Sequence, residues 1–200
     1  MTHICNIPSI LKYGLYARDW LEVFEIPFID ITEPYKVERR KRLGLTIYVP
    51  FHFFPWNPFD IVTLIKKLNL KGSFCYITLH QKQALHLQSL VTFDFPNMRR
   101  EISLHSLDEI CLSHIDKIRN NTDFTKPKHR FDALGECLIP DIVTVDNFSA
   151  IITASEEDKE LIELFAFDNL KCQVIIKPGY FKMTPGTARW FLPKRNFLSK

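Results

Sequence analysis

Hydrophobic residues along the chain follow two spacings, one typical of short strands and one typical of short helices. Segments rich in β-branched and aromatic residues predict strands. They cover residues 46–54, 73–79, 90–95, 135–139, 150–153 and 173–177. Helices and strands of this kind, without a regular alternation, predict an α+β fold.

Four helices are predicted from the residue types at their ends. Pro8 in a first turn and Gly14 at an end enclose one short helix. Asn57, followed by proline, is typical of an N-cap. Ser106, with a glutamate three residues later, forms a capping box. The acidic stretch after Ser155 predicts the fourth helix.

Length and composition indicate a globular protein of ordinary size. The 200 residues are 46% hydrophobic and 24% charged, values typical of one folded domain, which we place at 1–200. No apolar stretch reaches the ~20 residues of a membrane span, so we expect no membrane association. The five cysteines form an odd set without C-x-x-C spacing, which disfavours a disulfide framework and a zinc site. We therefore expect a cytoplasmic protein.

Glu136, in DALGECLIP, is the first candidate for chemistry. On a strand it shares one face with Leu134 and Leu138, whereas the other face is apolar throughout. A carboxylate among leucines has to be paired, change its pKa or line a cleft. The alternative, a strand end whose glutamate reaches water, carries equal weight here.

A basic run, KVERRKRLG, leads directly into the aromatic and proline-rich segment YVPFHFFPWNP. Guanidinium groups bind phosphate oxygens in pairs, and an aromatic wall suits the stacking of a ring. These features favour Arg39 and Arg40 as phosphate ligands. The alternative is a solvated helix surface. His52, between Phe51 and Phe53, is expected to face the opposite side from them, and a hydrogen-bonded structural role is the more frequent one for such a histidine.

The remaining motifs narrow the function further. The histidines have no spacing typical of metal ligands, so we expect no metal, and no glycine-rich phosphate loop follows a strand. From residue 171 to the C-terminus, basic and aromatic residues alternate without an acidic residue. This pattern is typical of single-stranded nucleic-acid binding, although for each residue taken singly an aromatic core residue or a surface charge fits slightly better.

These landmarks, taken in order, resemble the DNA ADP-ribosyltransferase toxins of the DarT family. The resemblance rests on THICNIPSILKYGL, on ITEPYKVERRKRLGLTIYVPFHFFPWNPFD and on GECLIP, and it covers about residues 2–152. It implies an ADP-ribosyltransferase fold with split sheets around an NAD cleft. Residues 153–200 are expected to be a basic, aromatic-rich part of the same domain.

The resemblance also implies the activity and its residues. ADP-ribose passes from NAD, a co-substrate, to a base in single-stranded DNA, and the HFF-x-x-NPFD form is similar to the guanine-modifying branch rather than the thymine branch. Glu136 and Arg40 fall on the catalytic positions. The residues expected to contact NAD are Thr2, His3, Asn6, Arg40 and Phe51. Those expected to contact DNA are Arg39, Lys41, Arg42, His52 and Trp56.

Partners and alternatives follow from the same family. Its toxins pair with an antitoxin that has macrodomain-type ADP-ribosyl hydrolase activity. The family usually carries a histidine two residues before the threonine matched by Thr2, where this sequence has only Met1. A start further upstream, a different role for His3 or impaired NAD binding would account for this difference. Modification of RNA or protein, or an inactive nucleic-acid-binding relative, are therefore alternatives.

One geometric expectation underlies all of these. The carboxylate of Glu136 should project into a dry hollow near the guanidinium of Arg40, with room between them for a dinucleotide. Replacing Glu136 with alanine should then abolish labelling of DNA without unfolding the protein.

Overall fold

The structure, a computed structural model, describes residues 1–53, 73–93, 101–108, 115–116, 134–166 and 170–181. Its strands are β1 (Thr2–His3), β2 (Leu15–Tyr16), β3 (Tyr48–His52), β4 (Phe74–Leu79), β5 (Leu90–Thr92), β6 (His105–Ser106), β7 (Glu136–Pro140), β8 (Ile142–Val143), β9 (Phe148–Thr153) and β10 (Gln173–Ile176). Its helices are α1 (Ile7–Tyr13), α2 (Arg18–Val23), α3 (Pro34–Arg42), α5 (Gln81–His86) and α8 (Glu156–Ala166), with 3-10 turns at Ile4–Asn6, Val145–Asn147 and Pro178–Tyr180.

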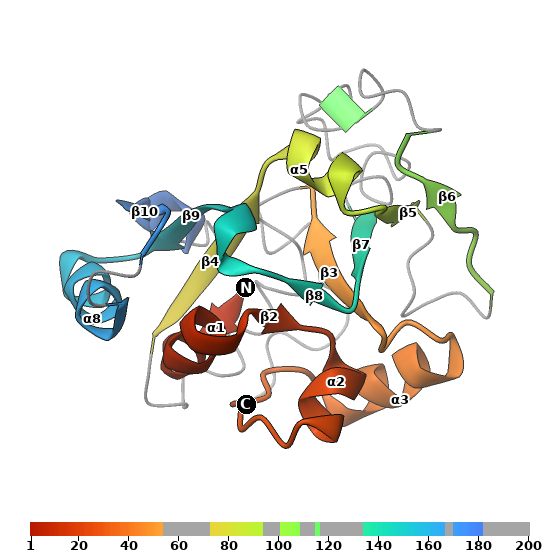
Figure 1. Cartoon of the computed structure of the whole chain (residues 1–200), viewed down its shortest axis with the longest axis horizontal. Coiled ribbons are helices and arrows are strands. Elements are labelled where there is room, and N and C mark those ends of the chain that lie inside the picture. The colour runs from red at the N-terminus through yellow and green to blue at the C-terminus, as the bar shows by residue number, and fades with distance from the viewer. Residues whose placement is uncertain (54–72, 94–100, 109–114, 117–133, 167–169, 182–200) are drawn as a thin grey trace, which may run out of the picture.

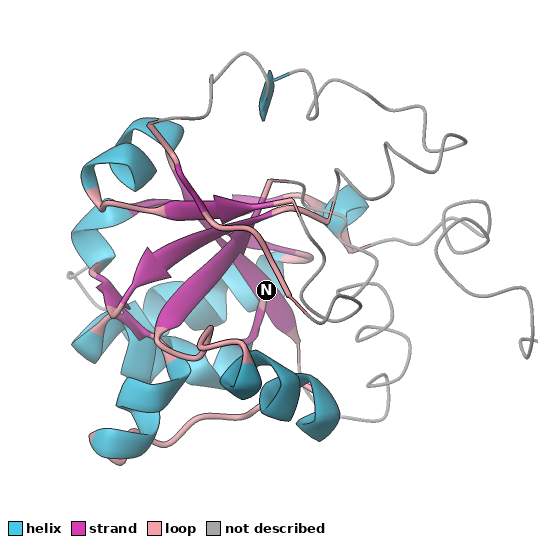
Figure 2. Cartoon of the chain, turned by 90° about the vertical axis from the view of Figure 1, so that its right-hand side faces the viewer, coloured by secondary structure: helices cyan, strands magenta, loops and turns pink. Residues whose placement is uncertain are grey.

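The described strands form two four-stranded sheets and one two-stranded ribbon. The first sheet has the order β1-β4-β9-β10, with only the β9–β10 pair parallel. The second has the order β3-β7-β5-β6 and is antiparallel throughout. The ribbon joins β2 to β8. In Figure 1 the first sheet lies to the left and the second to the right, and Figure 2 shows helices packed below the strands.

Helix α1 illustrates how sequence signals set local structure. Pro8 occupies its first turn, where no backbone N–H is needed. Gly14 ends it at a φ of 96°, and its N–H donates to the carbonyl of Ile10. A Cβ at position 14 would lie 2.9 Å from Cδ1 of Ile142. Glycine is thus required both by its backbone angle and by the close approach of β8.

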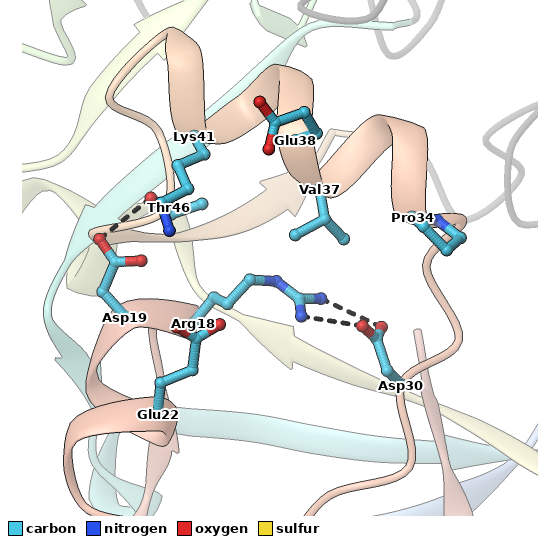
Figure 3. Close-up of a pocket in the computed structure, with 9 residues that line it drawn as sticks. All are labelled: Arg18, Asp19, Glu22, Asp30, Pro34, Val37, Glu38, Lys41 and Thr46. Atoms are coloured by element: carbon cyan, nitrogen blue, oxygen red, sulfur yellow. Dashed lines mark hydrogen bonds and ion pairs between the residues drawn. The ribbon is translucent and has the colours of Figure 1, made fainter.

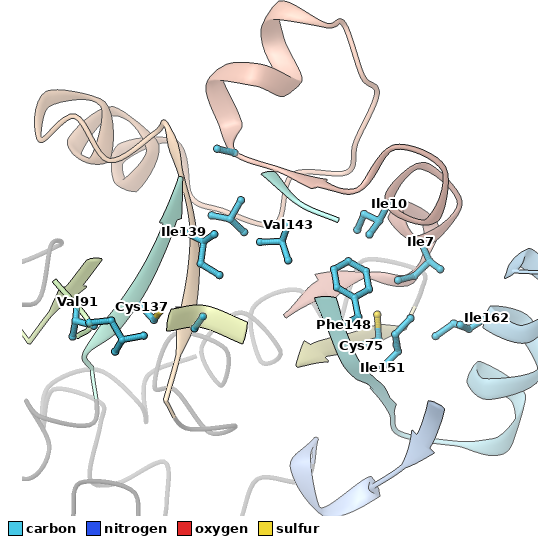
Figure 4. Close-up of a cluster of buried hydrophobic side chains, with 14 of the residues drawn as sticks. Ile7, Ile10, Cys75, Val91, Cys137, Ile139, Val143, Phe148, Ile151 and Ile162 are labelled. Atoms are coloured by element: carbon cyan, nitrogen blue, oxygen red, sulfur yellow. The ribbon is translucent and has the colours of Figure 1, made fainter. Parts of the chain in front are cut away.

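Buried apolar side chains from both larger sheets form one core (Figure 4). The members near the first sheet and the helices are Ile7, Ile10, Cys75, Phe148, Ile151 and Ile162. Those near the second sheet and the ribbon are Val91, Cys137, Ile139 and Val143. Burying one such aliphatic side chain contributes about 1.5–3 kcal/mol. The core therefore holds β7, the central strand that carries Glu136, in a fixed position.

The α+β prediction is confirmed, and a strand occurs in each of the six predicted segments. The helices predicted at 8–14 and after Ser155 occur as α1 and α8. The helix predicted after Asn57 lies outside the described residues. Most of the helix predicted after Ser106 also lies outside the described residues. Ser106 itself ends β6 opposite Leu90, and its hydroxyl donates to the carboxylate of Asp108.

Candidate active site

Helix α3 carries Arg40, and a Schellman turn closes the end of the helix. Gly44 adopts a φ of 67°, in the left-handed region that favours glycine. The N–H of Leu45 donates to the carbonyl of Arg40 at 2.9 Å, and that of Gly44 donates to the carbonyl of Lys41 at 3.0 Å. The side chain of Leu45 is buried in the core region. The backbone of Arg40 is therefore held by the turn that follows it.

Glu136 begins β7, between β3 and β5. Its Cα partners are His52 on β3 and Thr92 on β5. Directly opposed side chains on neighbouring strands project from the same face, with Cβ atoms roughly 4.5–5.5 Å apart. His52, Glu136 and Thr92 consequently form a polar row across three strands. The carboxylate in the middle of this row is buried, with Glu136 only 3% exposed.

An ion pair joins Glu136 to Arg40, which lies 96 residues away in the sequence. Nη1 of Arg40 donates to Oε2 at 2.8 Å and to Oε1 at 3.0 Å. The side chains are 4% exposed for the glutamate and 14% for the arginine. An unpaired carboxylate at this depth would carry a large desolvation cost, which the guanidinium offsets. The pair satisfies the glutamate and leaves much of the arginine fork unused.

The expectation for these two groups is correct in part. The carboxylate is buried and lies beside the guanidinium. The expected room for a dinucleotide between them is wrong for this structure, because the two side chains are in direct contact. The attraction between opposite charges in a poorly hydrated site explains the closure. NAD therefore has to bind beside the pair or separate it.

One polar atom of this pair and one of the neighbouring His52 lack hydrogen-bond partners among the described residues. Among the described residues, the buried side-chain atoms without a hydrogen bond are Arg40 Nη2, His52 Nδ1, Gln81 Nε2 and Ser149 Oγ. Two of these four belong to residues that contact or directly oppose Glu136. A buried donor or acceptor left unpaired costs about 1–3 kcal/mol, and such groups concentrate where a ligand or water completes the site. This face of the second sheet thus has spare hydrogen-bonding capacity around a buried carboxylate.

The N-terminal residues expected at the NAD site form a separate network. Asn6 donates from Nδ2 to the hydroxyl of Thr2 and to the carbonyl of Ile29, and its Oδ1 accepts from the N–H of Ile29. The imidazole of His3 is buried, accepts from the N–H of Cys5 and packs edge-on against Phe74. Within the described residues, no hydrogen bond or ion pair joins this network to Arg40 or Glu136. It fixes the chain near residue 29 against the first sheet.

The other residues expected to contact NAD or DNA lie on the opposite face of β3, at the end of α3 or outside the described residues. Phe51 is opposite Cys137 and packs against the core, so the structure places it on the other face from Glu136. Arg39, Lys41 and Arg42 share the last turn of α3 with Arg40, where positive charge interacts favourably with the helix dipole. Trp56 lies outside the described residues.

A polar hollow lies beneath α3 and was not anticipated from the sequence (Figure 3). Its volume is about 300 Å³, and it is lined by Arg18, Asp19, Glu22, Asp30, Pro34, Val37, Glu38, Lys41 and Thr46. Arg18 donates to both carboxylate oxygens of Asp30, at 2.8 and 3.0 Å. Burial raises the pKa of Asp30, but the hydrogen bonds from Arg18 and Thr32 and the positive charge of Arg18 together outweigh it, so this pKa lies below its ordinary value. No motif marks these residues, because α2 and the loop before α3 are brought together only by folding.

Other chemistries find no support in the described residues. No group of three or more histidine, cysteine, aspartate or glutamate side chains there is arranged to hold a metal ion. Burial raises the pKa of the Cys137 thiol to about 11 and that of Cys75 to about 12, as expected for inert core cysteines. None of the described helices has both the length and the apolar character needed to cross a membrane.

Solved structures resemble this fold over most of the chain. Thermosipho africanus DarTG in complex with ADP-ribose superposes with a TM-score of 0.75 at 24% identity, covering 90% of this chain and 49% of that one. Thermus sp. 2.9 DarT in complex with ADP-ribosylated ssDNA gives 0.69 at 18% identity, covering 90% and 93%. The same Thermus protein in complex with NAD+ gives 0.64 at 16% identity, covering 90% and 94%. The predicted ADP-ribosyltransferase fold is confirmed.

A family model described as "ssDNA thymidine ADP-ribosyltransferase, DarT" matches residues 1–182. The chain therefore belongs to the DarT family and is a DNA ADP-ribosyltransferase, as the resemblance implied. No curated protein sequence matches it. The chain spans about half the length of the Thermosipho DarTG chain and nearly all of the Thermus DarT chain.

Proposed function

We propose that this protein transfers ADP-ribose from NAD, its co-substrate, to guanine in single-stranded DNA and releases nicotinamide. The observation that carries the proposal is the buried ion pair between Arg40 of α3 and Glu136 on an inner strand of the second sheet, in a chain of the DarT family. A related Thermus protein has been solved with NAD+ and another time with ADP-ribosylated ssDNA, which supports both substrates.

The chemistry needs a carboxylate and a cation rather than a metal. Cleavage of the bond between nicotinamide and ribose builds positive charge on the sugar, and a preorganised carboxylate stabilises it. We assign this role to Glu136, whose low exposure places it away from competing water. Nη2 of Arg40 is unpartnered, so the guanidinium can bind a phosphate or base oxygen while Nη1 stays on the carboxylate.

The NAD-binding residues proposed in addition to Arg40 are those of the N-terminal network. Asn6 is hydrogen-bonded to Thr2 and to the backbone of Ile29, and His3 accepts a hydrogen bond from the N–H of Cys5, so these side chains form a preorganised surface. Phe51 is retained as a proposed contributor, although it acts from the core side of β3.

The proposed path of DNA follows the end of α3 and β3. Its members are Arg39, Lys41, Arg42, His52 and Trp56. Cations at a helix end neutralise phosphates, and rings provide stacking for unpaired bases. The choice of guanine rests on the HFF-x-x-NPFD segment, whereas the family description names thymidine. Thymidine is therefore the second candidate base.

We also propose a partner that reverses the modification. The similarity to a DarTG chain, of which this chain covers about half, supports pairing with an antitoxin. Its macrodomain-type hydrolase activity follows from the resemblance to toxin–antitoxin pairs.

The test uses purified protein, NAD and short oligonucleotides in which either guanine or thymine is the only reactive base. We expect an ADP-ribose mass increment on the guanine-containing DNA, and none with Glu136→Gln. RNA of the same sequence and an unrelated protein serve as competing acceptors. Labelling of thymine alone would refute the base assignment, labelling of RNA or protein alone would refute DNA as the substrate, and no labelling would refute the activity.

A further inference from the structure

His52, which lies opposite Glu136, has a buried ring nitrogen without a hydrogen-bond partner among the described residues. His52 ends β3 and directly opposes Glu136, so both side chains project from the same face. Nδ1 of its imidazole is buried without a hydrogen bond among the described residues. A purely structural histidine normally satisfies such a nitrogen. The unpaired Nδ1 therefore points to a role that is completed by an incoming molecule.

The reaction proposed above requires a proton acceptor. When the bond between ribose C1′ and the nicotinamide nitrogen breaks, its electron pair stays on nicotinamide. A nitrogen of the DNA base then bonds to C1′, and its N–H proton has to leave. A side chain within hydrogen-bond reach of that nitrogen would accelerate the step by about 10²–10⁴-fold.

The two neighbouring residues are poorly suited to take this proton. The oxygens of Glu136 both accept from Nη1 of Arg40, and the same carboxylate has to stabilise the sugar. The guanidinium of Arg40 has no acceptor atom and stays protonated. A neutral imidazole has one ring nitrogen free to accept a proton, and histidine is the side chain that most often serves as a general base.

We propose that His52 is the general base of the transfer step, an inference that rests on the proposed function. Turning the ring about its Cβ–Cγ bond brings a nitrogen toward a base held beside Glu136. The proton passes from the attacking nitrogen of the DNA base to His52, as that nitrogen bonds to C1′ and nicotinamide departs. Hydrogen bonding to the base replaces the contact that Nδ1 lacks in the free protein.

The variant His52→Gln tests this assignment, because it keeps a hydrogen-bonding side chain but cannot carry the proton. We expect kcat at saturating NAD and DNA to fall about 10²-fold, while the dissociation constant for NAD stays within about threefold and that for DNA, which His52 also contacts, rises by less than about tenfold. The matched control is His105→Gln, a histidine on the exposed β6 edge of the same sheet, which should keep kcat unchanged.

A second variant separates chemistry from folding. His52→Ala opens space, and added imidazole should restore part of the lost transfer rate. Such rescue cannot arise if His52 only supports the sheet. The assignment is overturned if His52→Gln keeps more than a third of the wild-type kcat. It is also overturned if weaker binding of NAD or DNA explains the loss, or if imidazole has no effect on a folded His52→Ala protein. A wild-type protein without DNA labelling would instead refute the proposed function itself.

Discussion

Replacing Glu136 with glutamine changes two measurable quantities, the free energy of unfolding and the rate of DNA labelling. Glutamine keeps the size of the side chain and removes its charge, so Arg40 faces a neutral amide in a site where its own side chain is only 14% exposed. Breaking a buried ion pair by removing one partner costs about 3–5 kcal/mol. Because the amide oxygen still accepts one hydrogen bond, we expect a loss of about 2–3 kcal/mol, measured by urea denaturation.

The variant Glu136→Ala should lower the stability of the fold, whereas the sequence predicted a loss of DNA labelling without unfolding. Alanine leaves a cavity and an uncompensated guanidinium. We therefore expect the free energy of unfolding to fall by the full amount of about 3–5 kcal/mol. Domains of this size are stable by about 5–15 kcal/mol. Glutamine is therefore the better probe of catalysis, since it leaves a folded protein. We expect it to reduce labelling by about 10²–10³-fold, the usual loss for one electrostatic contact to a transition state.

A double-mutant cycle isolates the pair itself. Combining Glu136→Gln with Arg40→Gln should cost less than the sum of the single changes, by about 1–3 kcal/mol. The control is the exposed pair of Arg42 and Glu38, whose side chains are 75% and 58% exposed. Arg42→Gln should cost no more than about 0.5 kcal/mol. The proposed role of the ion pair is refuted if Glu136→Gln lowers the free energy of unfolding by less than about 1 kcal/mol. It is also refuted if this variant labels DNA at more than about a tenth of the wild-type rate.

Three further predictions concern other parts of the molecule. Arg18 holds the pKa of Asp30 below 3.8, so the ionised carboxylate stabilises the fold above that pH. Asp30→Asn should therefore lower the urea midpoint at pH 7, and the difference in midpoint between variant and wild type should vanish as the pH falls below 3.8. Gly44→Ala should cost about 1–2 kcal/mol because of its left-handed φ, although its Cβ would meet no atom; a comparable cost for Gly179→Ala would contradict this explanation. Exposed Cys5 should react with iodoacetamide in the folded protein, whereas Cys75, with a pKa of about 12, should react only after unfolding, as peptide mapping would show.

Several elements escaped sequence reasoning because their signals are too short. Strands β1, β2, β6 and β8 have two residues each, so an alternation of polar and apolar positions cannot appear in them. Their pairing depends on neighbours distant in the chain, such as Leu15 with Val143. Ser106 likewise pairs with Leu90 of β5, a long-range contact that its local capping-box signal does not reveal.

The sequence alone determined the composition of the site. A glutamate within an apolar strand is a local pattern, because a buried carboxylate needs a partner wherever the rest of the chain lies. The arginines followed by Leu43 and Gly44 are another, because glycine provides the backbone angle that ends the helix. Only the tertiary structure decided that Arg40 contacts the carboxylate directly, that His52 shares its face and that Phe51 does not. These relations depend on the register of β3 against β7, where a shift of one residue would exchange the two faces. That register follows from the packing of the whole core, which no local segment encodes.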